Sequence, residues 1–167
     1  DGRVRAATLR SSDYYGPGVT DSAWGERVFA PLVDGKTAQA TGALDVPHSV
    51  AFIQDVGRAA AELATRDAAL GRTWIAPHAP AHTAREMIAI AAKAAGVEPK
   101  VRGMGTLMMR FGGLFVPEAR ATVEMMYQFE SPFEVDASRI EREFGLTATP
   151  LAEGLARTVA WYRRRAG

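Results

Sequence analysis

The sequence has 167 residues, of which 47% are hydrophobic and 23% charged, and its formal net charge is +1. This composition is typical of a globular domain, and the near-zero charge gives no reason to expect nucleic acid or an anionic membrane as a partner. The absence of cysteine excludes disulfides, thiolate metal sites and cysteine nucleophiles, and it fits a cytoplasmic location. No signal peptide is visible, and no apolar run approaches the roughly 20 residues of a membrane-spanning helix.

Segments with strand character alternate with helical stretches along the chain, which predicts an α/β fold. Strands are expected at residues 5–11, 37–41, 48–53, 72–77, 99–104 and 133–136. Helices are expected at residues 22–33, 55–65, 84–95, 106–129, 138–144 and 150–165. The expected helix caps are Asp21 or Ser22, Asp55 and Thr83, with Gly96 as a C-terminal stop, and Asp136 or Ser138 is expected to open the helix that ends at Phe144. The apolar face of the first helix is expected to consist of Trp24, Val28, Phe29 and Leu32.

The stretch LRSSDYYGPG, residues 9–18, reads as a strand that stops at a Gly-Pro-Gly turn. Polar and aromatic groups at strand ends are where α/β proteins bind ligands. Neighbouring side chains in a strand point to opposite faces, so one of the two tyrosines should face the ligand and the other the protein. Such a strand needs a sheet before it in the chain. The sequence opens at Asp1 with a turn that leads directly into this strand, and we therefore expect it to be cut from a longer chain.

Motifs of self-contained catalysis are absent from the sequence. It contains no G-x-G-x-x-G, no Walker loop, no H-E-x-x-H, no G-x-S-x-G and no tyrosine followed four residues later by lysine. His78 and His82 are four residues apart, but they flank Pro80 in a loop, so we interpret them as structural. We expect no catalytic residue and no metal site within this chain.

Four motifs occur in an order that points to one family. Residues 9–18 are similar to L-R-x-x-N-x-Y-G-P-G, and residues 48–56, HSVAFIQDV, resemble R-x-x-x-x-V-x-D-V. Residues 135–139 resemble a D-x-S-K/R segment, and residues 149–162 are similar to T-x-L-x-E-G-L followed by T-V-x-W-x. On these motifs the chain resembles the C-terminal, substrate-binding half of an extended or atypical short-chain dehydrogenase/reductase of the NAD-dependent epimerase/dehydratase family.

This resemblance implies the last strands of a Rossmann-type parallel sheet plus a small mixed α/β substrate-binding domain. Residues 1–35 would form a late strand, the ligand turn and a helix. Residues 36–167 would be mainly substrate-binding, with a strand-helix unit at 48–80 that returns to the sheet. The absent N-terminal part would carry the glycine-rich loop, most of the contacts to NAD or NADP, and the catalytic Tyr-x-x-x-Lys pair. The chain would then associate with that missing half or with itself, and alone it would be inactive.

The resemblance also assigns site residues. The residues expected on the cofactor side are Ser11, Ser12, Tyr14 and Pro17. The residues expected on the substrate side are Asp13, Tyr15, His48 and Met125.

Three departures from the family pattern bear on the substrate. Asp13 stands where nucleotide-sugar enzymes carry asparagine, His48 where they carry a phosphate-binding arginine, and Met125 falls in a segment where another arginine is expected. A carboxylate only accepts hydrogen bonds and repels a diphosphate, and histidine lacks the bidentate fork of arginine. We therefore expect a small carbonyl or alcohol substrate rather than a nucleotide-diphosphate sugar.

Structural alternatives stay open for these residues. Asp13 could bond backbone amides at the turn, His48 could be a satisfied histidine at a strand start, and the methionines at 104, 108, 109, 125 and 126 could be packing residues. At the level of function, the alternatives are a non-catalytic NAD(P)-linked sensor or binding module, and an inactive fragment of a parent enzyme.

Overall fold

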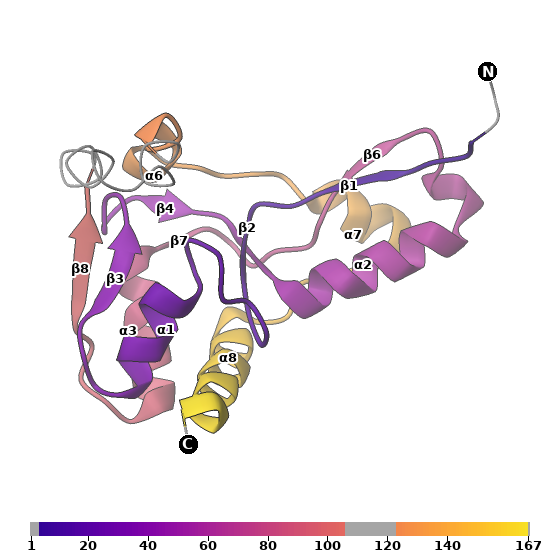
Figure 1. Ribbon diagram of the computed structural model, residues 1–167. Coiled ribbons are helices and arrows are strands. Elements are labelled where there is room, and N and C mark those ends of the chain that lie inside the picture. The colour runs from indigo at the N-terminus through magenta and orange to yellow at the C-terminus, as the bar shows by residue number, and fades with distance from the viewer. Residues whose placement is uncertain (1–3, 106–122, 167) are drawn as a thin grey trace.

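The computed structural model describes residues 4–105 and 123–166 (Figure 1). Its strands are β1 (Thr8–Arg10), β2 (Asp13–Tyr15), β3 (Ala38–Thr41), β4 (Pro47–His48), β5 (Val50–Phe52), β6 (Thr73–Ile75), β7 (His82–Thr83) and β8 (Val101–Met104). Its helices are α1 (Glu26–Val33), α2 (Ile53–Thr65), the 3-10 turn η1 (Asp67–Ala69), α3 (Ala84–Ala95), α6 (Tyr127–Glu130), α7 (Ser138–Phe144) and α8 (Leu151–Ala166).

The described strands pair two by two. β1 pairs with β6, β2 with β5 and β3 with β8, all in parallel, whereas β4 and β7 form a short antiparallel pair. Leu9 lies opposite Trp74 in the first pair, and Tyr14 lies opposite Ala51 in the second. Parallel pairs joined through helices are the mark of an α/β protein, so the predicted fold class is confirmed.

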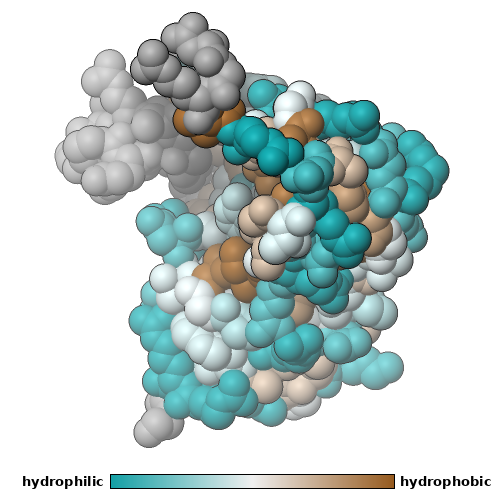
Figure 2. Space-filling model, turned by 90° about the vertical axis from the view of Figure 1, so that its right-hand side faces the viewer, coloured by the Kyte–Doolittle hydropathy of each residue, from teal (hydrophilic) through white to brown (hydrophobic). Residues whose placement is uncertain are grey.

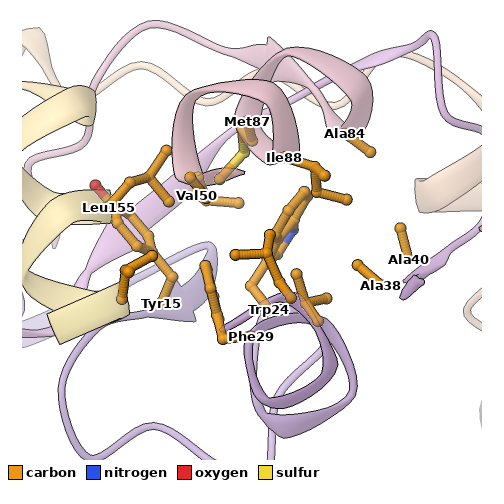
Figure 3. Close-up of a cluster of buried hydrophobic side chains, with 14 of the residues drawn as sticks. Tyr15, Trp24, Phe29, Ala38, Ala40, Val50, Ala84, Met87, Ile88 and Leu155 are labelled. Atoms are coloured by element: carbon orange, nitrogen blue, oxygen red, sulfur yellow. The ribbon is translucent and has the colours of Figure 1, made fainter. Parts of the chain in front are cut away.

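The larger hydrophobic core lies at one end of the molecule, where α1, α3 and α8 pack beside β3 and β8 (Figure 1). The four residues predicted as the apolar face of the first helix are all buried, although Trp24 precedes α1: Trp24, Val28, Phe29 and Leu32. Met87 and Ile88 from α3 and Leu155 from α8 close over them (Figure 3). α1 belongs to this core and therefore packs away from β1, although residues 1–35 were predicted to form one unit. The domain boundary at residue 35 stays a prediction.

A second, smaller core lies at the other end, between the β1–β6 pair and helices α2 and α7 (Figure 1). Its buried residues are Ala59, Leu63, Ala69, Trp74, Ile140 and Leu146. Trp74 anchors this core, since its ring meets Phe144 edge-on and its indole N–H donates to the Ala69 carbonyl at 3.0 Å. Two strands and two helices therefore pack aliphatic side chains around one buried aromatic ring.

Two predicted helix caps are wrong. α1 begins at Glu26 after Gly25, without a side-chain cap, because Ser22 uses its hydroxyl to donate to the Tyr14 carbonyl at 2.8 Å and to accept from the Trp24 N–H at 3.2 Å. α2 begins at Ile53, so Asp55 lies inside its first turn. Asp55 instead binds a distant segment of the chain.

Thr83 and Gly96 delimit α3 as predicted. The Thr83 hydroxyl accepts from the Glu86 N–H at 3.2 Å, and the Glu86 carboxylate accepts from the Thr83 N–H at 2.9 Å, which completes a capping box. Gly96 ends the helix in the left-handed conformation, with a φ of 60°.

The segment after β8 departs from the prediction. Of the long helix expected over 106–129, residues 106–122 lie outside the described residues, and α6 covers only Tyr127–Glu130. The strand expected at 133–136 is reduced to one bridge between Phe133 and His48, although the Val135 N–H also donates to the Ser49 hydroxyl at 3.3 Å. α7 begins at Ser138, one of its two expected first residues, and its N-cap is Ala137, without a side-chain cap; the Asp136 carboxylate accepts from the Ser138 N–H at 2.8 Å.

Candidate functional site

The chain passes from one parallel pair to another between β1 and β2. The Ala76 N–H donates to the Arg10 carbonyl at 2.8 Å, so the residues that directly follow β1 and β6 lie side by side. Ser11 and Ser12 follow β1 there, and His78 follows β6. Carboxyl ends of parallel strands are where open α/β sheets bind ligands. We call Ser11, Ser12, Asp13, His48 and His78 the β1–β2 junction.

Asp13 and His48 meet in the β1–β2 junction. The Asp13 Oδ2 atom lies 2.7 Å from His48 Nε2, with the imidazole 6% exposed and the carboxylate 28% exposed. β4 carries His48 and pairs with β7, and the β2–β5 register places Asp13 opposite Val50, two residues after His48. Since an ionised carboxylate only accepts, the Nε2–H group of His48 donates this hydrogen bond.

Two phenyl rings stack with the imidazole of His48. The ring of Phe129 lies 5.1 Å away at an interplanar angle of 10°, and that of Phe133 lies 4.8 Å away at 25°. Gly42 lets Phe129 approach, because a Cβ at this glycine would lie 2.3 Å from the Phe129 carbonyl oxygen, and its φ of 78° suits glycine. An aspartate therefore holds one edge of the imidazole while aromatic rings cover its plane.

Four polar side-chain atoms among the described residues are buried without a hydrogen-bond partner. They are Ser11 Oγ, Ser12 Oγ, His48 Nδ1 and His78 Nε2. All four belong to the β1–β2 junction. Buried polar groups in folded proteins are overwhelmingly paired, so a concentration of unpaired atoms in one region needs an explanation.

The two adjacent tyrosines point to opposite faces, as the strand geometry predicted. Tyr14 is 40% exposed, whereas Tyr15 is 1% exposed and packs against Phe52 and near Leu155 in the main core (Figure 3). Burial, and secondarily the negative charge of Asp55, raise the pKa of the Tyr15 phenol. Tyr15 is therefore a core residue, and the substrate contact expected of it has no exposed surface on which to form.

The other predicted site residues occupy varied environments. Ser12 is buried, Ser11 and Pro17 are half-buried, and Met125 is 49% exposed. Asp13 and His48 bond each other, which neither of the structural alternatives for them anticipated. Of the methionines, Met104 and Met126 are buried together, while Met108 and Met109 lie outside the described residues.

Sequence reasoning missed Phe129, Phe133 and His78. His78 was interpreted as a loop residue, and nothing in its neighbours indicates that β6 ends beside Ser11 and Ser12. Hydrogen bonding from Ser138 and, more weakly, the charge of Arg142 lower the pKa of the Asp136 carboxyl. The phenylalanines reach His48 through backbone pairing between distant segments, which no local pattern encodes.

Within residues 4–105 and 123–166, no group of three or more histidine, aspartate and glutamate side chains is arranged to hold a metal ion. None of the helices in that part of the chain combines the length and the apolar character needed to cross a membrane.

Solved structures share this arrangement of elements. UDP-glucuronic acid 4-epimerase from Bacillus cereus, in complex with UDP-glucuronic acid and NAD, superposes with a TM-score of 0.66 at 15% identity over 94% of this chain. For the dTDP-glucose 4,6-dehydratase DesIV from Streptomyces venezuelae, with NAD bound, the TM-score is 0.62 and the sequence identity 23% over 95% of this chain. For RMD from Pseudomonas aeruginosa, complexed with NADPH, the TM-score is 0.62 and the sequence identity 20% over 94% of this chain.

The fold is that of NAD-dependent epimerases and dehydratases. The chain spans 45% of the Bacillus cereus protein, 44% of the Streptomyces venezuelae protein and 47% of the Pseudomonas aeruginosa protein. A match of this extent is consistent with the predicted C-terminal half of an extended short-chain dehydrogenase/reductase. No protein-family model matches the sequence, and no curated protein matches it significantly.

Proposed function

We propose that this chain is the substrate-binding part of an NAD(P)-dependent oxidoreductase or epimerase that acts on a small carbonyl or alcohol. The observation that carries the proposal is the Asp13–His48 pair, at a junction of parallel strands in an epimerase/dehydratase fold. In the parent protein, the remaining part would supply the glycine-rich loop and the catalytic tyrosine and lysine. Ser11, Ser12, Tyr14 and Pro17 would face NAD or NADP, and Asp13, His48 and Met125 would face the substrate.

The Asp13–His48 pair argues against a diphosphate ligand at this position. A carboxylate a few ångström from a diphosphate would repel it by about 1–4 kcal/mol. His48 cannot compensate through Nε2, because that N–H group already donates to Asp13. The Bacillus cereus relative binds UDP-glucuronic acid, so the proposal is that this chain has the same fold with a different substrate.

The surface beside β1 supports association with another part of the sheet. A groove of about 360 Å³ runs between β1 and α2, lined by Arg5, Ala7, Leu9, Ala60, Leu63, Ala64 and Leu70. In the described structure β1 pairs on one side only, with β6. Apolar residues interrupt the hydrophilic surface on this side of the molecule (Figure 2). We propose that the remaining part of the parent protein, or a second copy of this chain when alone, covers this edge.

Restoring the family residues at Asp13 and His48 tests the substrate proposal. In the full-length protein with NAD bound, calorimetry should detect no UDP-glucose binding to the wild type. The double variant Asp13→Asn/His48→Arg should gain at least about tenfold in affinity, since it removes the repulsion and adds a bidentate donor. His82→Arg, which adds the same charge on β7, is the matched control and should gain nothing. Tight UDP-glucose binding by the wild type would refute the proposed substrate class.

Hydride transfer tests the enzyme assignment itself. With a small alcohol or carbonyl substrate, the full-length protein should change NAD(P)H absorbance if it is a dehydrogenase or reductase. If it is an epimerase, it should interconvert stereoisomers with no net change in NAD(P)H. The 167-residue chain alone should do neither. A full-length protein that binds NAD(P) without turning over any member of a panel of small alcohols and carbonyls would instead favour the sensor alternative. Turnover by the isolated chain would contradict the assignment of the catalytic pair to the remaining part.

A further inference from the structure

The four unpaired atoms of the β1–β2 junction define a particular hydrogen-bonding chemistry. Ser12 and His48 are 9% and 5% exposed, so their polar atoms cannot rely on bulk water. Leaving such groups unpaired costs stability, and native proteins retain few of them. None of the four is used in the contacts that hold the described residues together, which suggests that a ligand uses them.

The bonds that the two histidines already make determine which nitrogen of each carries the proton. His48 donates from Nε2 to the Asp13 carboxylate at 2.7 Å, and His78 donates from Nδ1 to the Ala79 carbonyl at 2.9 Å. Both partners are pure acceptors, so both of these ring nitrogens are protonated. In a neutral imidazole the other nitrogen is then a lone-pair acceptor. With both rings neutral, the unpaired atoms His48 Nδ1 and His78 Nε2 are acceptors, and this neutral state is part of what the proposal asserts.

The fold brings these acceptors to one region. Ser11 and Ser12 continue from β1, His78 continues from β6 beside them, and Asp13 links the same stretch to His48. The serine hydroxyls can donate or accept, whereas the imidazole nitrogens can only accept. An ionised phosphate group offers only acceptors and finds no partner at either nitrogen. A hydroxyl or amide group offers the donor that each nitrogen lacks.

We propose that His48 Nδ1 and His78 Nε2 are paired hydrogen-bond acceptors that, with the hydroxyls of Ser11 and Ser12, bind the donor groups of a neutral, hydroxyl-rich ligand. This rests on the proposed function and deepens it, because it specifies the substrate as a neutral polyol. It also moves Ser11 and Ser12 from the cofactor side to the substrate side. Phe129 and Phe133 stack on the imidazole of His48, so the ligand meets that ring at its edge. Asp13 acts as a positioning residue, since it holds His48 in the tautomer that accepts at Nδ1.

The tautomers can be measured directly on the wild-type chain. Long-range ¹H–¹⁵N spectra at pH 8, where an ordinary histidine is neutral, distinguish a protonated from an unprotonated ring nitrogen. We expect His48 as the Nε2–H form and His78 as the Nδ1–H form. The opposite tautomer, or a ring protonated on both nitrogens, at either residue would overturn the proposal without any variant being made.

Two probes then test the ligand chemistry. Methyl α-D-glucopyranoside supplies hydroxyl donors without charge, and inorganic pyrophosphate supplies only acceptors. On titration of the ¹⁵N-labelled chain, the glucoside should shift the resonances of His48 Nδ1 and His78 Nε2, and pyrophosphate should leave them unchanged. A response to pyrophosphate, or to neither probe, would overturn the proposal.

Serine variants separate a binding role from a structural one. Ser11→Ala and Ser12→Ala remove unpaired hydroxyls, so the unfolding midpoint of the free chain should stay level or rise. Affinity for the glucoside should fall by about 3- to 10-fold for each hydrogen bond lost. A matched control is Ser22→Ala, which removes a paired hydroxyl and should lower the midpoint without changing affinity. A lower midpoint with unchanged affinity in the Ser11 and Ser12 variants would assign them a structural role and refute the proposal.

Failure of the acceptor-pair proposal can be distinguished from failure of the proposed function. The imidazole response needs no cofactor, so it can succeed in a protein that never transfers a hydride. Conversely, hydride transfer with no glucoside response would leave the enzyme assignment standing and overturn the acceptor pair.

Discussion

Asp55 is a buried link between two distant segments, and removing it should destabilise the whole chain. It is 2% exposed, and its carboxylate accepts from the Thr149 N–H at 2.6 Å and from the Thr149 hydroxyl at 2.8 Å. Arg58 lies 3.0 Å from the same carboxylate. These contacts fasten the first turn of α2 to the residues that lead into α8. We therefore choose Asp55→Ala as the main perturbation, with Asp55→Asn beside it.

The expected magnitudes follow from the contacts. A hydrogen bond to a charged acceptor contributes about 1.5–3 kcal/mol, so losing two of them in Asp55→Ala should cost about 4 kcal/mol. For a chain of this size that corresponds to a fall in melting temperature of about 8–16 °C. Asp55→Asn should cost only about 1–2 kcal/mol, because its carbonyl still accepts from the Thr149 N–H and its amide can donate to the Thr149 hydroxyl oxygen.

Urea unfolding followed by circular dichroism measures both variants through the midpoint and the slope. Thr149→Val, which keeps the backbone N–H, should cost about 1.5–3 kcal/mol, and combining it with Asp55→Ala should be clearly less than additive. Arg58→Ala is a control for the half-exposed ion pair and should cost at most about 1 kcal/mol. Equal losses in Asp55→Ala and Asp55→Asn, or a loss below about 1 kcal/mol in the former, would refute this reasoning.

Three further predictions concern other contacts. Gly154→Ala would place a Cβ 2.5 Å from the Tyr15 hydroxyl and should cost about 1–3 kcal/mol in urea unfolding, which Tyr15→Phe in the same chain should partly restore. Thr83→Ala should cost about 1 kcal/mol through loss of the cap. Hydrogen bonds from Thr83 lower the pKa of the Glu86 carboxyl in the folded chain. The ionised carboxylate therefore stabilises the fold at pH values above its unfolded-state pKa, and this stabilisation is lost as the pH falls through its folded-state pKa. In Glu86→Gln, the free energy of unfolding should depend less on pH in this acidic range. Burial raises the pKa of the Tyr162 phenol to about 12, so a spectrophotometric titration should show it ionising after an exposed tyrosine, and stability should fall as pH rises from about 10 to about 12; an ordinary titration of all tyrosines would contradict this.

Local patterns predicted those elements whose signals lie within a few residues. The capping box at Thr83 and the left-handed Gly96 are encoded by neighbouring side chains, so α3 could be placed closely from sequence. The caps of α1 and α2 failed for the opposite reason. Ser22 and Asp55 are good N-cap residues in isolation, but each is occupied by a partner outside its own helix, at Tyr14 and at Thr149.

The candidate site divides in the same way. Asp13 and His48 were recognised as departures from a family pattern, but 35 residues separate them, and only the β2–β5 register brings them to 2.7 Å. The opposite orientation of Tyr14 and Tyr15 follows from strand geometry, whereas which one is buried depends on where α8 packs. Phe129, in α6, is held near the site because its carbonyl accepts from the Ala43 N–H, and His78 follows β6, which pairs with β1; neither contact has a local signal.

The sequence by itself determined the α/β class, most of the elements and the resemblance to a C-terminal epimerase/dehydratase half, because periodicity and short motifs are local properties. The tertiary structure alone decided that Asp13 is bonded to His48, that Tyr15 belongs to the core and that four buried polar atoms gather where β1 passes to β2. Burial and hydrogen-bond pairing depend on which segments meet in space. That depends on packing over the whole chain, and a side chain's own neighbours in sequence do not fix it.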